Sequence, residues 1–298
     1  MGTSQTLLEA VTYFSDPDRA HGYFVSVRWP NGVACPRMGC GSAGVQYIKT
    51  RRVWRCKGCE RQFTAKVGTV FEDSPLPLTK WLPAIWLISA ARNGISSCEV
   101  ARALGVTQKT AWFMLHRIRV AMQSETFEKL SGEIEVDETF IGPKYRSQHR
   151  RPKEITTPRG NKGPGTGKIT VFGIRERGGK VRAWVVRDQK RGTLLPRVWD
   201  DVAKGSTVYT DSLGSYHSLK HDYVHHVINH AEKYVDGKVH TNSIENFWSV
   251  LKRTIGGTYI CPRAKHLDAY LDEQIFRYKR TRTVRTSASP SRVSTASA

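Results

Sequence analysis

The chain has 298 residues, in which Lys and Arg outnumber Asp and Glu by 47 to 26, giving a formal net charge of +21 at pH 7. This length allows more than one folded unit. The charge predicts a polyanionic partner, with a basic surface that has no specific partner as the alternative. The first twenty residues carry three acids and no long apolar run, which argues against a secretory signal, and the longest apolar stretch, Trp81 to Ala91, is about half of a bilayer crossing. We therefore expect a cytoplasmic protein without membrane contact.

Periodicity and chain breakers divide the sequence into four segments. They are 1–72, a metal-binding segment with an N-terminal helix; 73–130, which is helical; 131–280, which mixes strands and helices; and 281–298, a basic Ser/Thr-rich tail expected to be disordered. In the mixed segment we predict strands at 133–141, 169–175, 181–186, 207–210 and 225–228, and helices at 193–203 and 244–253. The third segment is therefore predicted to be an α/β domain.

A long loop is predicted between the first two of these strands, where 144–162 contains seven Lys or Arg residues. It is interpreted either as a phosphate-contacting arm, with Arg150 and Arg151 at its centre, or as a solvated insertion. The residue types leave both interpretations open.

Four cysteines occur as two pairs, Cys35 with Cys40 and Cys56 with Cys59, separated by 15 residues. Two such pairs can wrap a tetrahedral Zn²⁺, and glycines beside the cysteines favour the tight turns that this requires. Because four thiolates leave no open coordination position, the pattern predicts a zinc ribbon whose metal is structural. The residues of the intervening hairpin that we expect to contact DNA, rather than solvent or protein, are Arg51, Arg52 and Arg55.

A helix-turn-helix is predicted from 95 to 119, with Gly105 ending one helix and Thr107 capping the next. The residues expected to face inward are Val106, Ala111, Met114, Leu115 and Ile118. The residues expected to face a DNA groove are Gln108, Lys109, Thr110 and Arg117. The alternative is a helical hairpin that serves only the fold.

Acidic residues accompany two predicted strands and one predicted helix. Asp137 lies in the first strand, on the face shared by Glu133 and Glu135 if that strand is regular, Asp211 ends an apolar strand, and Glu245 begins the helix. Three such acids can converge on Mg²⁺ or Mn²⁺, and two such ions suit phosphodiester chemistry. Lys252 follows Glu245 by two helical turns, where its ammonium can hold a DNA phosphate or remain solvated.

These motifs together resemble the bacterial insertion-sequence transposases that have an N-terminal zinc ribbon and a DDE catalytic domain, a group related to the eukaryotic Merlin elements. The resemblance covers roughly residues 15–280. It rests on CPRMGC and CKGC, on QFTAKVGTVFEDS, and on EIEVDETFIG, VYTDSLGSY and HTNSIENFWSVLKRTIGGTY. It implies a ribonuclease H-like catalytic domain, preceded by the zinc ribbon and the helix-turn-helix.

The resemblance also implies the site residues. Asp137, Asp211 and Glu245 would be the metal-binding triad and Lys252 its accompanying basic residue, and His240 and Asn242 resemble site residues of the family or else serve as loop caps. The third catalytic position stays open between Asn242, Glu245 and Asn246, with Glu245 preferred because Lys252 keeps the expected offset from it.

The resulting hypothesis is a transposase that uses Mg²⁺ to cut double-stranded DNA at terminal inverted repeats and joins the freed 3′ ends to target DNA. Pairing two ends would require a dimer or a higher homo-oligomer on DNA. The alternatives are a DNA-binding regulator derived from a transposase and a structure-selective nuclease that cuts without joining.

Overall fold

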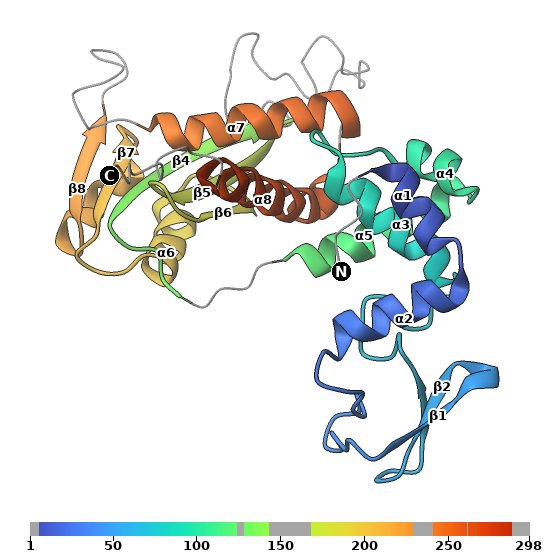
Figure 1. Cartoon of the computed structure of the whole chain (residues 1–298). Coiled ribbons are helices and arrows are strands. Elements are labelled where there is room, and N and C mark those ends of the chain that lie inside the picture. Colours follow the sequence, from blue (N-terminus) through green and yellow to red (C-terminus); the bar gives the residue numbers. More distant parts are fainter. Residues whose placement is uncertain (1–5, 124–127, 143–167, 229–240, 261, 288–298) are drawn as a thin grey trace, which may run out of the picture. The chain divides into compact units, whose positions relative to one another are not determined.

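The computed structural model describes residues 6–123, 128–142, 168–228, 241–260 and 262–287. The chain forms two compact units, Met1–Ala121 and Met122–Ala298 (Figure 1). The predicted ribbon and most of the helical segment belong to the first unit, and the division into four segments remains a prediction. Among the described residues, no helix combines the length and the apolar character that crossing a membrane demands.

The first unit begins with two capped helices. Thr6 and Glu9 form a capping box for α1 (Leu7–Phe14), and the Asp16 carboxylate accepts backbone N–H groups at the start of α2 (Pro17–Arg28). Both helices pack on α3 (Leu78–Ala90) through Ala10, Phe14, Ala20 and Leu82.

A three-stranded antiparallel sheet follows α2 along the chain. Its strands are β1 (Val45–Ile48), β2 (Val53–Cys56) and β3 (Gln62–Thr64), in the order β1-β2-β3. A short 3₁₀ turn, Lys49–Arg51, joins the first two. Trp54 and Phe63 are buried with stacked rings between the cysteine turns, so that this small sheet has its own apolar core.

The unit ends in α4 (Ser97–Leu104) and α5 (Gln108–Met122). Gly105 ends α4 with φ of 61°, a left-handed conformation that favours glycine, and the Thr107 hydroxyl accepts the backbone N–H of Thr110. Both predicted caps are therefore confirmed. Of the residues expected to face inward, Ala111, Met114, Leu115 and Ile118 are buried and Val106 is half-buried.

The second unit is built on a five-stranded mixed sheet in the order β6-β5-β4-β7-β8. Its strands are β4 (Glu133–Ile141), β5 (Ile169–Glu176), β6 (Val181–Val186), β7 (Thr207–Asp211) and β8 (Val224–Ile228). β4, β5 and β6 pair antiparallel, whereas β7 runs parallel to both β4 and β8. All five strands were predicted, with ends that differ by at most one residue.

Helices cover both faces of this sheet (Figure 1). One face packs on α6 (Arg191–Asp201) and on the 3₁₀ helix η3 (Gly214–His221). The other packs on α7 (Asn242–Thr254), a π-helical turn (Ile255–Tyr259) and α8 (Ala264–Ser287). The acids of β4 and β7 therefore lie between two layers of helices.

The predicted helix ends differ from those of the structure, and the helix predicted at 244–253 is α7, which runs from Asn242 to Thr254. The helix predicted at 193–203 is α6, which begins at Arg191 because Asp188 accepts the Lys190 N–H and the Thr193 hydroxyl, and which ends at Asp201 because Val202 pairs with Leu130 instead. The helix α8 continues to Ser287, past residue 281, where the disordered tail was predicted to begin.

Candidate functional site

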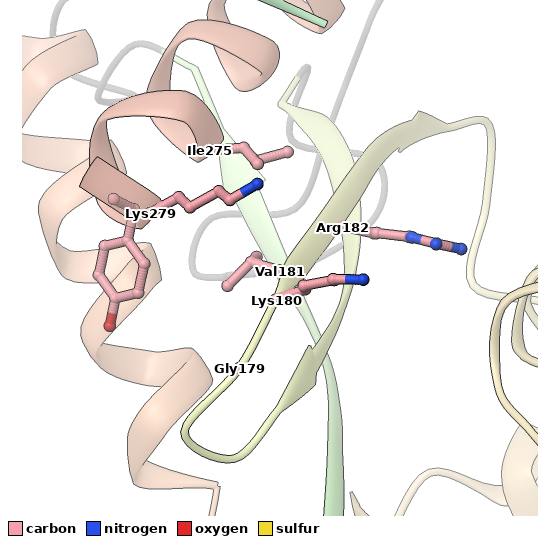
Figure 2. A pocket seen from close by; sticks show the side chains of 7 residues that line it. Gly179, Lys180, Val181, Arg182, Ile275 and Lys279 are labelled. Atoms are coloured by element: carbon pink, nitrogen blue, oxygen red, sulfur yellow. The ribbon is translucent and has the colours of Figure 1, made fainter. Parts of the chain in front are cut away.

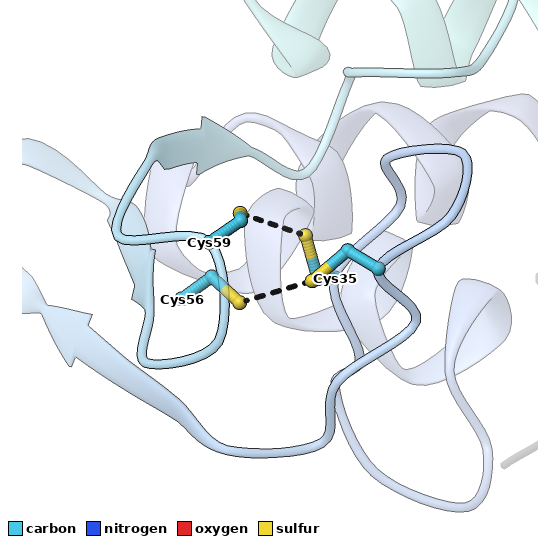
Figure 3. A group of neighbouring side chains, drawn as sticks. Cys35, Cys56 and Cys59 are labelled. Carbon is cyan, nitrogen blue, oxygen red and sulfur yellow. Dashed lines mark hydrogen bonds between the residues drawn. The ribbon is translucent and has the colours of Figure 1, made fainter.

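The first candidate site is the cysteine cluster of the ribbon. Cys35 and Cys40 lie on the loop before β1, Cys56 is the last residue of β2 and Cys59 lies on the turn after it, so that the two pairs face each other (Figure 3). The Sγ atoms of Cys35 and Cys59 are 3.9 Å apart, and those of Cys40 and Cys56 are 3.6 Å apart. Four thiolates around a tetrahedral Zn²⁺, each about 2.3 Å from the ion, have sulfurs about 3.8 Å apart. The cluster therefore fits a structural zinc ion.

The thiols of the cluster differ in acidity. A backbone N–H of Arg37 lowers the pKa of the Cys35 thiol, but burial and the neighbouring thiols outweigh it and raise that pKa to about 11. Backbone N–H groups of Cys59 and Gly58 lower the pKa of the Cys56 thiol to about 6, which favours the thiolate that binds metal. The spacing of the cysteines predicted these four ligands, and the fold brings all four together.

The second candidate site is a cluster of three carboxylates, from Asp137 and Glu138 of β4 and Asp211 at the end of β7. One oxygen of each lies within 4.8 Å of the others. The parallel register pairs Glu135 with Tyr209, so two residues further along, Asp137 comes beside Asp211. The sheet therefore joins two of the acids that the sequence predicted.

Glu138 was not predicted. Neighbouring residues of a strand point to opposite faces, and the contacts show this: the Trp248 indole of α7 donates to Asp137 Oδ2 at 3.0 Å, whereas the Tyr216 hydroxyl of η3 donates to Glu138. Asp211 ends β7, so both side chains of β4 can reach its carboxylate, one from each face. The only signal in the sequence was an acid next to Asp137 and a tyrosine shortly after Asp211.

Burial and mutual repulsion shape the acid–base behaviour of this cluster. Burial raises the pKa of Asp137 to about 6, and the negative charges of Asp211 and Glu245 add to this shift. Burial also raises the pKa of Glu138 to about 8, with Asp211 and Asp137 contributing. Carboxylates that repel one another in a half-buried place are an arrangement that a divalent cation would stabilise.

Glu245 and Lys252 lie on α7, close enough to interact electrostatically with Asp137. Glu245 raises the pKa of Asp137, and its own carboxylate accepts a hydrogen bond from the Thr241 hydroxyl at 3.0 Å. Burial lowers the pKa of Lys252, while Asp137 acts in the opposite sense and the charge of Lys168 adds to the lowering. An acid and a base of α7 therefore accompany the three carboxylates.

The other residues considered for the third position differ in their contacts. The side-chain oxygen of Asn246 accepts the Tyr278 hydroxyl of α8 at 3.1 Å, which commits it to the contact between α7 and α8. Asn242 is exposed at the start of α7. His240 lies outside the described residues.

A buried acid, Glu135, fixes the start of α7. Its carboxylate is fully buried and accepts the backbone N–H of Ile244 at 2.8 Å and the guanidinium of Arg177 at 2.8 Å. The residue before the helix, Thr241, makes no side-chain hydrogen bond to the first-turn N–H groups. Glu135 of the strand β4 therefore provides the acceptor that an N-cap side chain usually provides. This bond holds the first turn of α7, which carries Glu245, against β4.

The residues expected to contact DNA are placed as follows. Arg51, Arg55, Gln108 and Lys109 are exposed, and Thr110 is half-buried. Arg52 is exposed but forms an ion pair with Asp18 at 2.8 Å, whereas Arg117 donates to the backbone carbonyl of Glu72 within the same unit. Arg150 and Arg151 lie outside the described residues.

A small pocket lies apart from the acids, between the turn that joins β5 to β6 and helix α8 (Figure 2). Two of its basic residues, Lys180 and Arg182, pair with Glu128 and Asp201, respectively, and a third, Lys279, also lines it. Its lining contains no acid, so the pocket does not extend the carboxylate cluster.

Both units of the chain match known protein domains. Residues 129–279 match the ISXO2-like transposase domain, and residues 15–62 match the transposase zinc-ribbon domain. An uncharacterized protein in the transposable element ISH50 of Halobacterium salinarum is 28% identical over 250 residues, which cover 80% of this chain and 83% of that protein. An uncharacterized transposase-like protein of Haemophilus influenzae is 34% identical over 100 residues, 33% of this chain and 80% of that protein. Because the first of these domain matches spans just over half of the chain, the protein belongs to the ISXO2-like transposase family.

Proposed function

We propose that the protein binds the terminal inverted repeats of an insertion sequence, cleaves the ends of the element, and joins the 3′ ends to target DNA. The cluster of Asp137, Glu138 and Asp211, with Glu245 and Lys252 beside it, carries this proposal. Such an enzyme would act on double-stranded DNA in the cytoplasm. Synapsis of two ends would require a dimer or higher oligomer.

The donor set fits Mg²⁺ or Mn²⁺. Oxygens about 2.1 Å from one Mg²⁺ ion lie about 3–4 Å apart, and the three carboxylates have oxygens within 4.8 Å of one another. We propose that Asp137, Asp211 and Glu245 hold the catalytic ions, with Glu138 as a fourth acid. When bound, the ions would supply the activation of water or of a 3′ hydroxyl and the stabilisation of the leaving oxygen.

The protein groups around the acids bind and orient the DNA. Lys252 interacts electrostatically with Asp137 and lies on the same helix as Glu245, so its side chain is placed to hold a phosphate next to the reacting bond. Asn242, at the start of α7, and His240, just before it, are proposed to complete the site.

We propose that the second unit has the ribonuclease H-like fold. Three strands, a helix, a strand, a short helix, a strand and a helix follow one another in the order that the family resemblance implies. In the first unit, we propose that α4 and α5 form the DNA-reading helix-turn-helix, and that its exposed Gln108 and Lys109, with Arg51 and Arg55 of the ribbon, contact the terminal repeats.

The test is a cleavage and joining assay with Mg²⁺ and labelled terminal-repeat DNA from the element that encodes the protein. Asp211→Ala should reduce both cleavage and joining by at least about a thousandfold, because it removes a ligand of the ions that stabilise transition-state charge. Binding to the same DNA should be retained. Asp200→Asn, at an exposed position of α6, is the matched control and should behave like the wild type.

Three outcomes would contradict the proposal. A fully active Asp211→Ala variant would remove the carboxylates from the mechanism. Specific binding by the wild type without cutting would favour the regulator, and cutting without joining would favour the nuclease.

A further inference from the structure

The contact between Trp248 of α7 and Asp137 of β4 joins a buried aromatic side chain to a residue of the acidic cluster. The Trp248 side chain is 4% exposed, and its indole N–H donates to Asp137 Oδ2 at 3.0 Å. The ring packs beside Phe247, with centroids 5.1 Å apart, in the apolar layer between α7 and the sheet. The orientation of the indole is therefore set by packing rather than by the acid that it contacts.

A glycine makes this arrangement possible. Gly173 of β5 is the cross-strand partner of Asp137. A Cβ atom added at Gly173 would lie 2.5 Å from two carbon atoms of the Trp248 ring, closer than any real contact. The absence of a side chain at Gly173 thus provides the space from which the indole reaches Asp137.

The rest of α7 holds Trp248 in place. Ile244, one helical turn earlier, gives its backbone N–H to Glu135, which lies two residues before Asp137 on the same face of β4. The helix is therefore bonded to the strand at two points, and only the second of these involves an acid of the cluster.

We propose that Trp248 is a positioning residue for the catalytic carboxylate of Asp137, and that Gly173 is required for it. The indole N–H donates to Oδ2 and holds the carboxylate in one rotamer, with an oxygen within 4.8 Å of the Asp211 carboxylate. A hydrogen bond of this kind orients a metal ligand and lowers the entropy lost on metal binding. This inference rests on the proposed function, because it requires that Asp137 bind a divalent cation.

The test compares Trp248→Phe with the wild type over a range of Mg²⁺ concentrations in the cleavage assay, using the full-length protein. Phe keeps an apolar ring and removes the N–H donor. The Mg²⁺ concentration for half-maximal cleavage should rise roughly tenfold, whereas the rate at saturating Mg²⁺ should fall much less. Trp184→Phe is the control: Trp184 stacks on Phe172 on the opposite face of the sheet, and its variant should need the same Mg²⁺ concentration as the wild type.

A second variant tests the hydrogen bond between Trp248 and Asp137 without changing either residue. Gly173→Ala should displace the indole and raise the Mg²⁺ requirement in the same direction. An NMR measurement complements both variants. The Trp248 indole N–H resonance is identified by its absence from the spectrum of Trp248→Phe, and it should shift when Mg²⁺ is added to the wild type. It should stay in place in the Asp137→Asn variant.

The outcomes separate this inference from the function on which it rests. If Asp137→Asn cleaves like the wild type, the proposed role of the carboxylates is wrong. If Asp137→Asn is inactive while folded Trp248→Phe and Gly173→Ala keep the wild-type Mg²⁺ requirement, the positioning role is overturned and the function stands. A lower melting temperature with an unchanged Mg²⁺ requirement would likewise reduce Trp248 to a packing residue.

Discussion

Glu138 shows how one side chain can change the chemistry of a site without belonging to the expected motif. It is half-buried, accepts a hydrogen bond from the buried Tyr216 hydroxyl, and lies within 4.8 Å of two other carboxylates. Such an arrangement disfavours the charged form unless a cation is present. We therefore expect Glu138 to link the stability of the protein to both pH and divalent cations.

The sign of this pH dependence follows from the raised pKa values. The pKa of Glu138 increases from 4.5 to about 8, and that of Asp137 from 3.8 to about 6, so the folded state binds protons more tightly than the unfolded chain. These two groups therefore add stability at low pH, and this contribution is lost as the pH rises from about 4 to about 8.

Glu138→Gln should remove the larger part of the decrease in stability that the wild type shows as the pH rises. In buffer without Mg²⁺, we expect the free energy of unfolding of the variant at pH 8 to exceed that of the wild type by on the order of 2 kcal/mol, and the two to converge near pH 4.5. Urea unfolding at several pH values measures this. Identical pH profiles for the two proteins would contradict the prediction, and adding Mg²⁺ should stabilise the wild type more than the variant.

At the scale of elements, the site depends on how α7 is attached to the sheet. The helix carries Glu245 and Lys252, whereas the other acids lie on the strands β4 and β7. Glu135 attaches its first turn, and Arg175 of β5 donates to the carbonyl of Ser243 in the same turn. Two strands, β4 and β5, therefore position the start of the helix through the buried charged side chains of Glu135 and Arg175.

Glu135→Ala should destabilise the protein by about 2–4 kcal/mol, because it removes a buried carboxylate from Arg177 and leaves the Ile244 N–H without its acceptor. Glu135→Gln keeps an acceptor for that N–H and should cost less. Urea unfolding measures both, and cleavage at a temperature where the variants remain folded shows whether Glu245 is misplaced.

Glu133→Gln is the matched control for this prediction. Its side chain is 45% exposed and lies 3.6 Å from the same Arg177. Arg177 is 13% exposed and Glu133 also accepts the Tyr209 hydroxyl at 3.1 Å, but the solvated Glu133 carboxylate should keep the contribution of this pair to about 0–1 kcal/mol. Equal destabilisation by the two Gln variants would show that Glu135 acts as an ordinary surface partner of Arg177.

At the scale of the whole molecule, the two candidate metal sites are divided between the two units. The four cysteines belong to the first unit and the carboxylates to the second. The ribbon sheet has short strands and a small apolar core, so its fold depends on zinc far more than that of the second unit, whose sheet is covered on both faces.

Loss of zinc should therefore abolish specific DNA binding while leaving the second unit folded. We expect Cys56→Ser to unfold the ribbon and to abolish specific binding to the terminal repeats. The second unit should keep its cooperative unfolding transition and its response to Mg²⁺. Circular dichroism, gel-shift and thermal unfolding measurements check these three points, and retention of specific binding by zinc-free protein would refute the role given to the ribbon.

The sequence by itself determined much of this protein. The strands of the second unit were predictable because alternating apolar residues and turn residues are local signals, and the zinc ligands were predictable because their spacing along the chain is itself the geometric requirement. Asp137 and Asp211 could be named for a similar reason, since each stands at a recognisable place on an apolar strand.

Only the tertiary structure decided how these parts meet. Glu138 belongs to the cluster because β7 ends beside it, and Asn246 contacts α8 because its side-chain oxygen accepts the Tyr278 hydroxyl. Glu135 became the cap of a helix about one hundred residues further along the chain. In each case the deciding partner comes from a distant segment, and the register of the strands, which no local pattern records, determines which side chains become neighbours.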